Sequence, residues 1–196
     1  MTSNKEEEKI ISDEVVKSPH KKRKNLSNRK RDRLNEGMKI WTSFYRLNIH
    51  RCAIDYLGLN LYPFQIILLY MMNIMYSVCL VCARGLSKSY TCAIFLVCKA
   101  ILYPNSLIVV SCSTKEQARN LIKEKIAKEL CSQSKMLKRE ISKVVIGTNE
   151  TVIYFHNGST ITAVNASQNT RGLRAHVLVV EICLDIHIYK SISVIG

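Results

Sequence analysis

Apolar and polar residues follow one another along this chain in blocks whose lengths predict both strands and helices. Three short runs rich in Val, Ile and Leu predict buried strands, since a strand covered on both faces has no polar side. These runs are Val78–Ala83, Leu107–Cys112 and His176–Val180. The segment Lys88–Leu102 is nearly all apolar and predicts a buried helix that stops before Pro104.

Two further segments have clearer periodic patterns. Residues 113–131 are amphipathic at helical spacing, and Ser113 or Thr114 can cap that helix. Residues 151–164 contain two apolar stretches around Asn157-Gly158, a dipeptide that tolerates positive φ and predicts a hairpin turn. Strands that alternate with helices predict an α/β fold, with a mainly parallel sheet flanked by helices on both faces.

The N-terminal third divides into a polar and an apolar part. Residues 1–35 hold almost no large apolar side chain after Val16, and residues 17–33 contain nine Lys or Arg against one acid. This composition predicts a disordered basic tail. Residues 38–58 predict one or two helices that end at Gly58, and Pro63 suits the first turn of the next helix.

The net charge of the chain says more about its partners than its length does. The 196 residues suffice for one domain, and the formal net charge of +14 suits a polyanionic partner such as nucleic acid or an anionic membrane. The first residues carry charges in place of a signal peptide's apolar stretch, which indicates a cytoplasmic protein. Eight cysteines, with only Cys79 and Cys82 in CxxC spacing, indicate small buried residues in a reducing compartment.

The longest uncharged segment permits a second interpretation. Ile66–Ala83 is 18 residues long, the lower limit for a membrane-spanning helix. Asn73 and Ser77 interrupt it, and its Leu- and Met-rich first half differs from its Val- and Cys-rich second half. A buried helix followed by a central strand gives the same composition, and we favour that interpretation.

The apolar run at Val78 leads into a candidate phosphate-binding loop. The pattern GxxxxGK[ST] aligns with residues 82–89, with Cys82 and Ser87 in place of both glycines. In such a loop the backbone amides and the helix N-terminus hold the phosphates, Lys88 supplies a positive charge and Ser89 binds Mg²⁺. The loop residues expected around ATP are Ala83, Arg84, Gly85, Leu86, Ser87, Lys88 and Ser89.

Several segments, in their order and spacing, resemble the N-terminal ATPase region of tailed-phage terminase large subunits, the motors that package viral DNA. The resemblance covers residues 38–181 and rests on these stretches: WTSFYRLNIHR, DYLG, PFQ, ARGLSKSY, ILYPNSLIVVSCSTKEQA and FHNGSTITAVNASQNTRGLRAHVLVV. It implies a P-loop NTPase fold of the ASCE type, with ATP and Mg²⁺ as cofactors. It also implies double-stranded DNA, a portal protein, a small terminase subunit and further copies of the chain as partners.

The resemblance assigns roles to three residues. Gln65 matches the glutamine that reads adenine, and Arg84 matches a loop arginine that stabilises charge during hydrolysis. Glu181 matches the acid that orients Mg²⁺ through water. The next position, the catalytic glutamate of the family, is Ile182 here. Hydrolysis is therefore expected to be very slow.

The likeness stops abruptly after Glu181. The expected organisation is a basic tail at 1–35, a partial ATPase domain at 36–181 and an unrelated tail at 182–196, with the nuclease domain absent and the ATPase fold incomplete at its C-terminus. Such a break suggests a shifted reading frame or an interrupted gene, in a phage- or prophage-encoded protein of a bacterial cytoplasm. Two alternatives stay open: a single-span membrane-associated protein with a basic cytosolic tail, and a basic nucleic-acid-binding module without enzymatic activity.

Overall fold

A computed structural model describes residues 19–83, 85–112, 114–147, 151–165, 174–183 and 188–194. The chain divides into two compact units, Met1–Ser43 and Phe44–Gly196. The second unit contains the sheet and all of the candidate site.

Helix α2 runs from Pro19 to Leu47. Over residues 19–35 it replaces the disordered tail that the composition predicts, and residues 1–18 lie outside the described part of the chain. Pro19 suits a first helical position, Lys, Arg and Leu are good helix formers, and no glycine precedes Gly37. The lack of apolar residues in this segment argues against a packed core. A solvated helix forms without a packed core, so the composition does not exclude it.

The next helices agree with the expected pattern. They are α3 (Ile49–Arg51), the π-helical turn η1 (Cys52–Tyr56) and α4 (Pro63–Ile74). Gly58 follows η1 with φ 69°, a conformation that suits glycine. Pro63 is the first residue of α4, as predicted.

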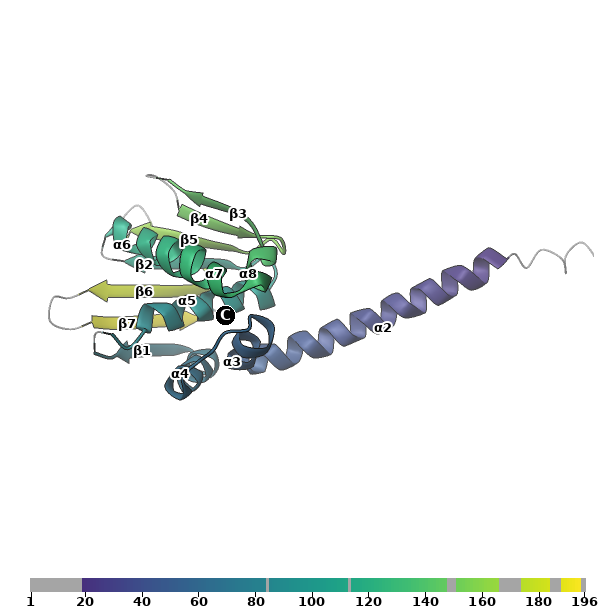
Figure 1. The fold of residues 1–196 in the computed structure, drawn as a ribbon, viewed down its shortest axis with the longest axis horizontal. Helices are drawn as coiled ribbons and strands as arrows, with labels where there is room; N and C mark the ends of the chain where they lie inside the picture. The colour runs from purple at the N-terminus through teal and green to yellow at the C-terminus, as the bar shows by residue number, and fades with distance from the viewer. Residues whose placement is uncertain are drawn as a thin grey trace, which may run out of the picture. The chain divides into compact units, whose positions relative to one another are not determined.

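Within the described part of the chain, seven strands form one open mixed sheet in the order β1-β7-β6-β2-β5-β4-β3 (Figure 1). The strands are β1 (Ser77–Val81), β2 (Leu107–Cys112), β3 (Ile141–Ile146), β4 (Thr151–Phe155), β5 (Thr160–Asn165), β6 (Val177–Cys183) and β7 (Ile188–Val194). β2 pairs parallel with β5 and β6, whereas β7 and β4 run antiparallel to their neighbours. The predicted α/β class is confirmed. The prediction of a mainly parallel sheet is wrong, because only the β2–β5 and β2–β6 pairs are parallel.

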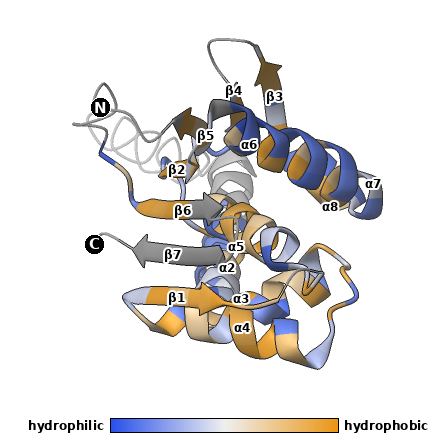
Figure 2. Cartoon of the chain, turned by 90° about the vertical axis from the view of Figure 1, so that its left-hand side faces the viewer, coloured by the Kyte–Doolittle hydropathy of each residue, from blue (hydrophilic) through white to orange (hydrophobic). Residues whose placement is uncertain are grey.

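Helices connect these strands on one side of the sheet. α5 (Lys88–Leu102) joins β1 to β2, and a helical segment joins β2 to β3 through α6 (Lys115–Asn120), the π-helix η2 (Leu121–Leu130), α7 (Cys131–Gln133) and α8 (Lys135–Glu140). α5 packs against η2, and Figures 1 and 2 place both over the same face. The prediction of helices on both faces does not hold for these two connections. Each joins parallel strands and advances in the same direction along the sheet, and two crossovers of the usual right hand then lie on one face.

The core lies between α5 and the sheet. Every residue of α5 from Thr91 to Ala100 is buried, which explains why this helix is apolar all round. Its bounds and those of β2 match the predicted segments residue for residue. The cap of α6 is Thr114, whose Oγ1 accepts a hydrogen bond from the Gln117 amide at 3.3 Å.

The β4–β5 hairpin is confirmed, with its turn at His156–Ser159. Gly158 has φ 84°, and an added Cβ would lie 2.2 Å from Asn105 Oδ1. The Asn157 side chain donates to the carbonyls of Ala100 and Ile101 at 2.7 and 3.1 Å, so the turn also caps the end of α5. This position therefore requires glycine for both its conformation and its close approach to Asn105.

Strand β7 occupies part of the segment that the sequence analysis treats as an unrelated tail. It lies between β6 and β1, with Ser193 opposite Ser77 and Val194 opposite Val177. Apolar residues at Ile188, Ile192 and Val194 alternate with others, a period-two signal that predicts a strand.

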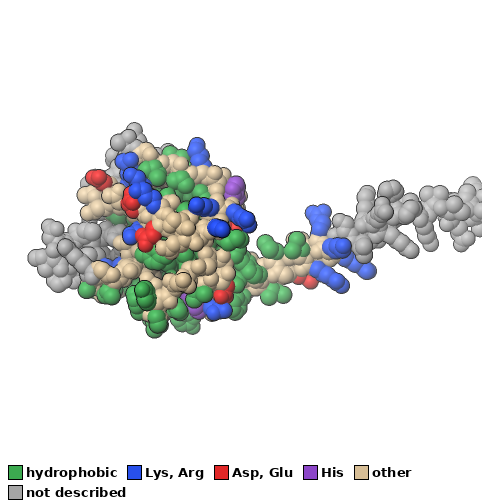
Figure 3. Space-filling model, in the orientation of Figure 1, with side chains coloured by type: hydrophobic (Ala, Val, Ile, Leu, Met, Phe, Trp, Pro, Cys, Tyr) green, Lys and Arg blue, Asp and Glu red, His purple; other side chains and the backbone are tan. Residues whose placement is uncertain are grey.

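Helix α4 is apolar on two sides. Leu69 and Met72 are fully buried, yet Ile67 and Ile74 are 64% and 59% exposed. Figure 2 shows α4 as strongly hydrophobic, and Figure 3 shows hydrophobic side chains gathered on the surface where α4 and β1 lie in Figure 1. Among the described residues no helix has the length and hydropathy to cross a membrane. The run Ile66–Ala83 is divided between α4 and β1, so the predicted order of helix and strand is confirmed. The prediction of a buried, central strand is wrong, because β1 is an edge strand and is largely exposed.

Candidate functional site

The loop between β1 and α5 turns through two left-handed residues. Gly85 has φ 86°, and Ser87, the N-cap of α5, has φ 49° and ψ 29°. A left-handed conformation costs a non-glycine residue about 1 kcal/mol or more. Ser87 therefore occupies the position of a pattern glycine and adopts the backbone conformation that glycine would favour.

Lys88 is the buried centre of this loop. Its side chain is 7% exposed, and Nζ donates to the carbonyl oxygens of Cys82 and Ala83, each at 2.6 Å. A buried ammonium requires such partners, because desolvation of an unpaired charge is very unfavourable. The bonds draw the start of the loop around the Lys88 side chain, so one cation organises the turn from strand to helix.

Helix α5 begins at this cation. The Thr91 amide donates to the Ser87 carbonyl at 2.9 Å, which closes the first turn. The first amides of a helix have no acceptor within it, and a helix of 15 residues carries a substantial positive partial charge at this end. Ser89, the predicted Mg²⁺ ligand, is half-buried in this first turn.

Glu181 lies near the carboxyl ends of the parallel strands, on the side of the sheet where the loop leaves β1. Through β7 the register aligns Leu80 of β1 with Lys190 and Lys190 with Glu181, and Glu181 also lies opposite Cys112 of β2. The parallel strands β1, β6 and β2 all end at this edge. Since β7 separates β1 from β6, the two strands are about 10 Å apart, twice the usual strand spacing.

Gln65 has a structural contact that the sequence analysis did not foresee. It is 2% exposed on α4, and its Oε1 accepts a hydrogen bond from the Tyr62 amide at 2.9 Å. A glutamine at this position of a helix that bonds back to the preceding amide forms half of a capping box. The residue thus fixes the start of α4, and it is buried instead of lying on the helix surface.

Arg84, the predicted loop arginine, lies outside the described residues. The two CxxC cysteines also differ from expectation, because Cys79 is exposed and Cys82 is half-buried. β1 has helices on one side only, so alternate residues of this strand face outward. The described residues contain no cluster of three or more His, Cys, Asp or Glu able to hold a metal ion.

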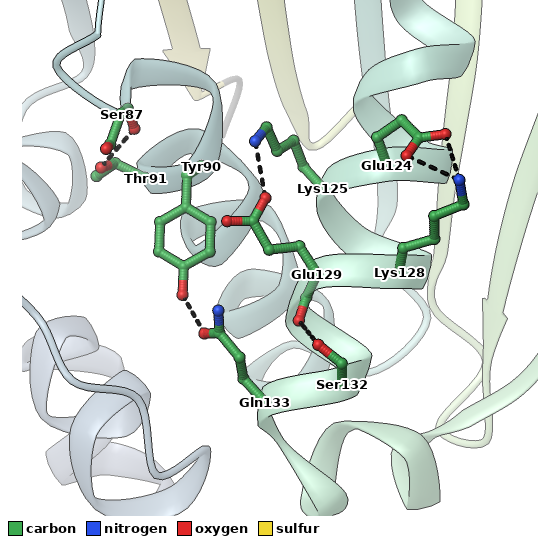
Figure 4. A network of polar contacts seen from close by, with 9 residues as sticks. All are labelled: Ser87, Tyr90, Thr91, Glu124, Lys125, Lys128, Glu129, Ser132 and Gln133. Atoms are coloured by element: carbon green, nitrogen blue, oxygen red, sulfur yellow. Dashed lines mark hydrogen bonds and ion pairs between the residues drawn. The ribbon is translucent and has the colours of Figure 1, made fainter.

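A polar network that sequence reasoning missed joins the start of α5 to η2 and α7 (Figure 4). Tyr90 Oη donates to Gln133 Oε1 at 2.5 Å, and Lys125 bonds Glu129 at 2.7 Å one helical turn away. Burial, and then the nearby Glu129 carboxylate, raise the pKa of Tyr90. The network holds the first turn of α5 in place from outside the loop. The i,i+4 spacing of Lys125 and Glu129 was the available signal for it.

Two other buried titratable groups lie away from the loop. Lys99, at the other end of α5, is 6% exposed with its Nζ over the rings of Phe95 and Tyr103, and burial lowers its pKa. His50 has a buried Nδ1 without a hydrogen-bond partner among the described residues, and its ring meets Tyr70 edge-on. Burial, followed by the Arg51 cation, lowers the pKa of His50. Both groups support packing and lie outside the candidate site.

No known family model matches this chain. A search of curated proteins likewise finds no match. The candidate site therefore depends on its own geometry.

Proposed function

We propose that the chain binds ATP with Mg²⁺ in the loop between β1 and α5, as a P-loop ATPase module of the kind found in terminase large subunits. The observation that supports this most is the enclosure of the Lys88 ammonium, which bonds the Cys82 and Ala83 carbonyls at 2.6 Å. A loop that wraps a cation at the N-terminus of a long helix offers charge and backbone amides together to a phosphate.

Each candidate residue has a proposed role in binding ATP and Mg²⁺. Lys88 exchanges its loop carbonyls for β- and γ-phosphate oxygens, and Ser89 binds Mg²⁺. Glu181, at the same edge of the sheet, orients Mg²⁺ through water, and Arg84 acts on the γ-phosphate. Since Gln65 Oε1 accepts from the Tyr62 amide, its proposed adenine contact falls to Nε2, which donates to a ring nitrogen.

Hydrolysis is expected to be slow in this chain. The position after Glu181 is Ile182, which cannot polarise an attacking water. We therefore propose ATP binding with little turnover, in the cytoplasm of a bacterial host. The proposed assembly partners are a portal protein, a small terminase subunit and further copies of the chain.

Double-stranded DNA is the proposed macromolecular partner. Helix α2 carries ten Lys or Arg against two acidic residues, and Arg29, Lys30, Arg31 and Arg33 are exposed. Such a helix neutralises phosphates without reading sequence, so its contribution falls steeply with salt. The same observation supports the second candidate, a basic nucleic-acid-binding module without enzymatic activity. In that case DNA binding persists and ATP binding is absent.

The experiment is a titration of a fluorescent ATP analogue with Mg²⁺ against the wild type, Lys88→Met and Lys99→Met. Loss of a charge-assisted contact of about 1.5–3 kcal/mol predicts a Kd roughly 10- to 100-fold higher for Lys88→Met. Lys99→Met is the matched control, because it removes a buried lysine from the other end of the same helix. Circular dichroism checks that both variants fold. Equal affinity of Lys88→Met and wild type would overturn the proposal.

A further inference from the structure

An uncharged stripe on α4 and its flanking residues holds eight of the fifteen exposed large apolar side chains that the structure describes in the second unit. Phe64, Ile67, Met71 and Ile74 follow one another at steps of three, four and three, which places them on one face of the helix. We call the exposed surface of α4 and its flanking residues the α4 face. Its eight exposed side chains are Phe64 43%, Ile67 64%, Tyr70 43%, Met71 37% and Ile74 59% on the helix, and Tyr62 67%, Met75 45% and Tyr76 68% beside its ends.

The opposite side of α4 packs against the rest of the second unit. Leu69 and Met72 are fully buried, and Asn73 Nδ2 donates to the carbonyls of Arg46 and Leu47 at 2.9 and 3.2 Å. These contacts fix α4 on the body of the second unit. The exposed α4 face is therefore presented on a rigid support and points away from it, and a helix that is apolar on both sides usually has both sides covered.

Charge selects the occupant of this face. The chain has a net charge of +14, yet no charged residue occurs between Asp55 and Arg84. Two copies of so basic a chain repel each other on most surfaces, but on the α4 face they meet without opposed cations. A membrane-bound helix would instead need Lys or Arg beside its apolar stripe to reach anionic headgroups, and α4 has none.

The size of the face also fits a second copy. Eight large side chains, each about half exposed, offer on the order of 800 Å² together. A standard stable interface buries about 800 Å² on each partner. A face that pairs with itself about a two-fold axis buries this area on both copies and closes the assembly at two.

We propose that α4 packs through its exposed face against α4 of a second copy of this chain, forming a two-fold dimer. The heptad-like spacing of Phe64, Ile67, Met71 and Ile74 gives each helix a seam of apolar side chains that interdigitate across the axis. This inference does not depend on nucleotide binding.

The test is sedimentation equilibrium of the full chain from about 1 to 100 µM, a range that spans moderate dimer affinities. We expect the mass to rise with concentration and level off at twice 22.4 kDa. Ile67→Lys places one lysine of each copy in the interface and should raise the dimer Kd at least about 30-fold. Ile74→Lys, about two turns further along the same seam, should also raise the dimer Kd. It provides the test if Ile67→Lys folds poorly.

Val144→Lys is the matched control, since Val144 is 38% exposed on β3, at the far edge of the sheet. It should leave the dimer Kd unchanged. A wild-type mass that stays at one copy throughout, or that rises beyond two copies without levelling, would overturn the proposal. So would folded Ile67→Lys and Ile74→Lys variants with wild-type affinity, or a Val144→Lys variant that dissociates equally.

Discussion

The two ends of the sheet are built in different ways. At one end β3, β4 and β5 follow one another in the chain and pair antiparallel through short connections. At the other end β1 pairs with β7, so that Ser77 lies opposite Ser193. Local pairing at the first end needs little loop closure, whereas the second end depends on a strand from the distant C-terminal segment.

The two edge strands, β3 and β1, also differ in how well they resist pairing with another chain. β3 carries exposed Lys143 and a register shift between Ile141 and Lys143, two features that discourage pairing with another chain. β1 contains no charge, and α4 beside it exposes an apolar face. The candidate ATP loop follows β1. The proposed site therefore belongs to the end of the sheet whose pairing depends on the C-terminal segment and whose edge strand carries no charge.

The largest effect should come from breaking β7. Ile192 lies opposite both Val78 and Val179, so Ile192→Pro removes a ladder hydrogen bond inside the sheet. We expect a loss of about 3 kcal/mol or more in unfolding free energy, measured by urea denaturation. Hydrogen exchange should speed up in Ser77–Val81 before it does in Thr151–Phe155.

Val144→Pro is the corresponding change at the other end. β3 is an edge strand with one neighbour, so a proline there should cost clearly less than Ile192→Pro. A larger loss for Val144→Pro would show that β3, and not β7, closes the sheet.

The next effect concerns the β4–β5 turn. Gly158→Ala combines a positive φ of 84° with a Cβ 2.2 Å from Asn105 Oδ1, and should destabilise the protein by about 2 kcal/mol. Gly58→Ala provides the control, since Gly58 has φ 69° and nothing within 4 Å of an added Cβ. It should cost only about 1 kcal/mol in thermal or urea unfolding. Equal losses would show that the contact with Asn105 contributes nothing.

A smaller effect is the dependence of the unfolding free energy on pH, which should come from His50 in α3. His50 has a lowered pKa when folded, against an ordinary value of 6.5, so the unfolded chain binds more protons below that value. Stability should therefore be fully present above pH 6.5 and fall as the pH decreases from there. His50→Gln should flatten this slope in unfolding free energy against pH.

His156→Gln is the control, because His156 is exposed on the β4–β5 turn at the other end of the sheet. The slope should persist in this variant. A slope that is unchanged by His50→Gln would assign the acid sensitivity to another group.

The smallest effect is expected from the network beside the loop. Tyr90→Phe removes the hydrogen bond to Gln133 Oε1, and should cost about 0.5–1 kcal/mol and weaken ATP binding only slightly. Glu124→Gln alters an exposed pair with Lys128 in the same network and should change neither quantity. A large loss of ATP affinity in Tyr90→Phe would place Tyr90 in the binding site itself.

Local patterns explain which parts of the fold were predictable. Lys88–Leu102 and Leu107–Cys112 are apolar runs with clear ends, and Asn157-Gly158 defines its own turn, so each follows from nearby residues. Strand β3 and helix α8 lack so clear a pattern and were not predicted. The position of β7 could not follow from local pattern, because its pairing joins residues from opposite ends of the second unit.

The candidate site shows the same division. The sequence predicts Lys88 at a strand-to-helix turn, and the structure places it there. The enclosure of its ammonium by the Cys82 and Ala83 carbonyls depends on the loop backbone, with Ser87 in a left-handed conformation, and no residue pattern gives that. The capping role of Gln65 was missed because the residue was considered only as an adenine contact.

The central claim is that the backbone around Lys88 wraps a triphosphate, and amide hydrogen exchange tests it most directly. The wild type is compared without ligand, with ATP and Mg²⁺, and with adenosine and Mg²⁺. The account predicts slower exchange of the amides of Gly85–Ser89 with ATP, and no such protection with adenosine or in Lys88→Met. Unchanged exchange in this segment at saturating ATP, or equal protection by adenosine, would contradict it.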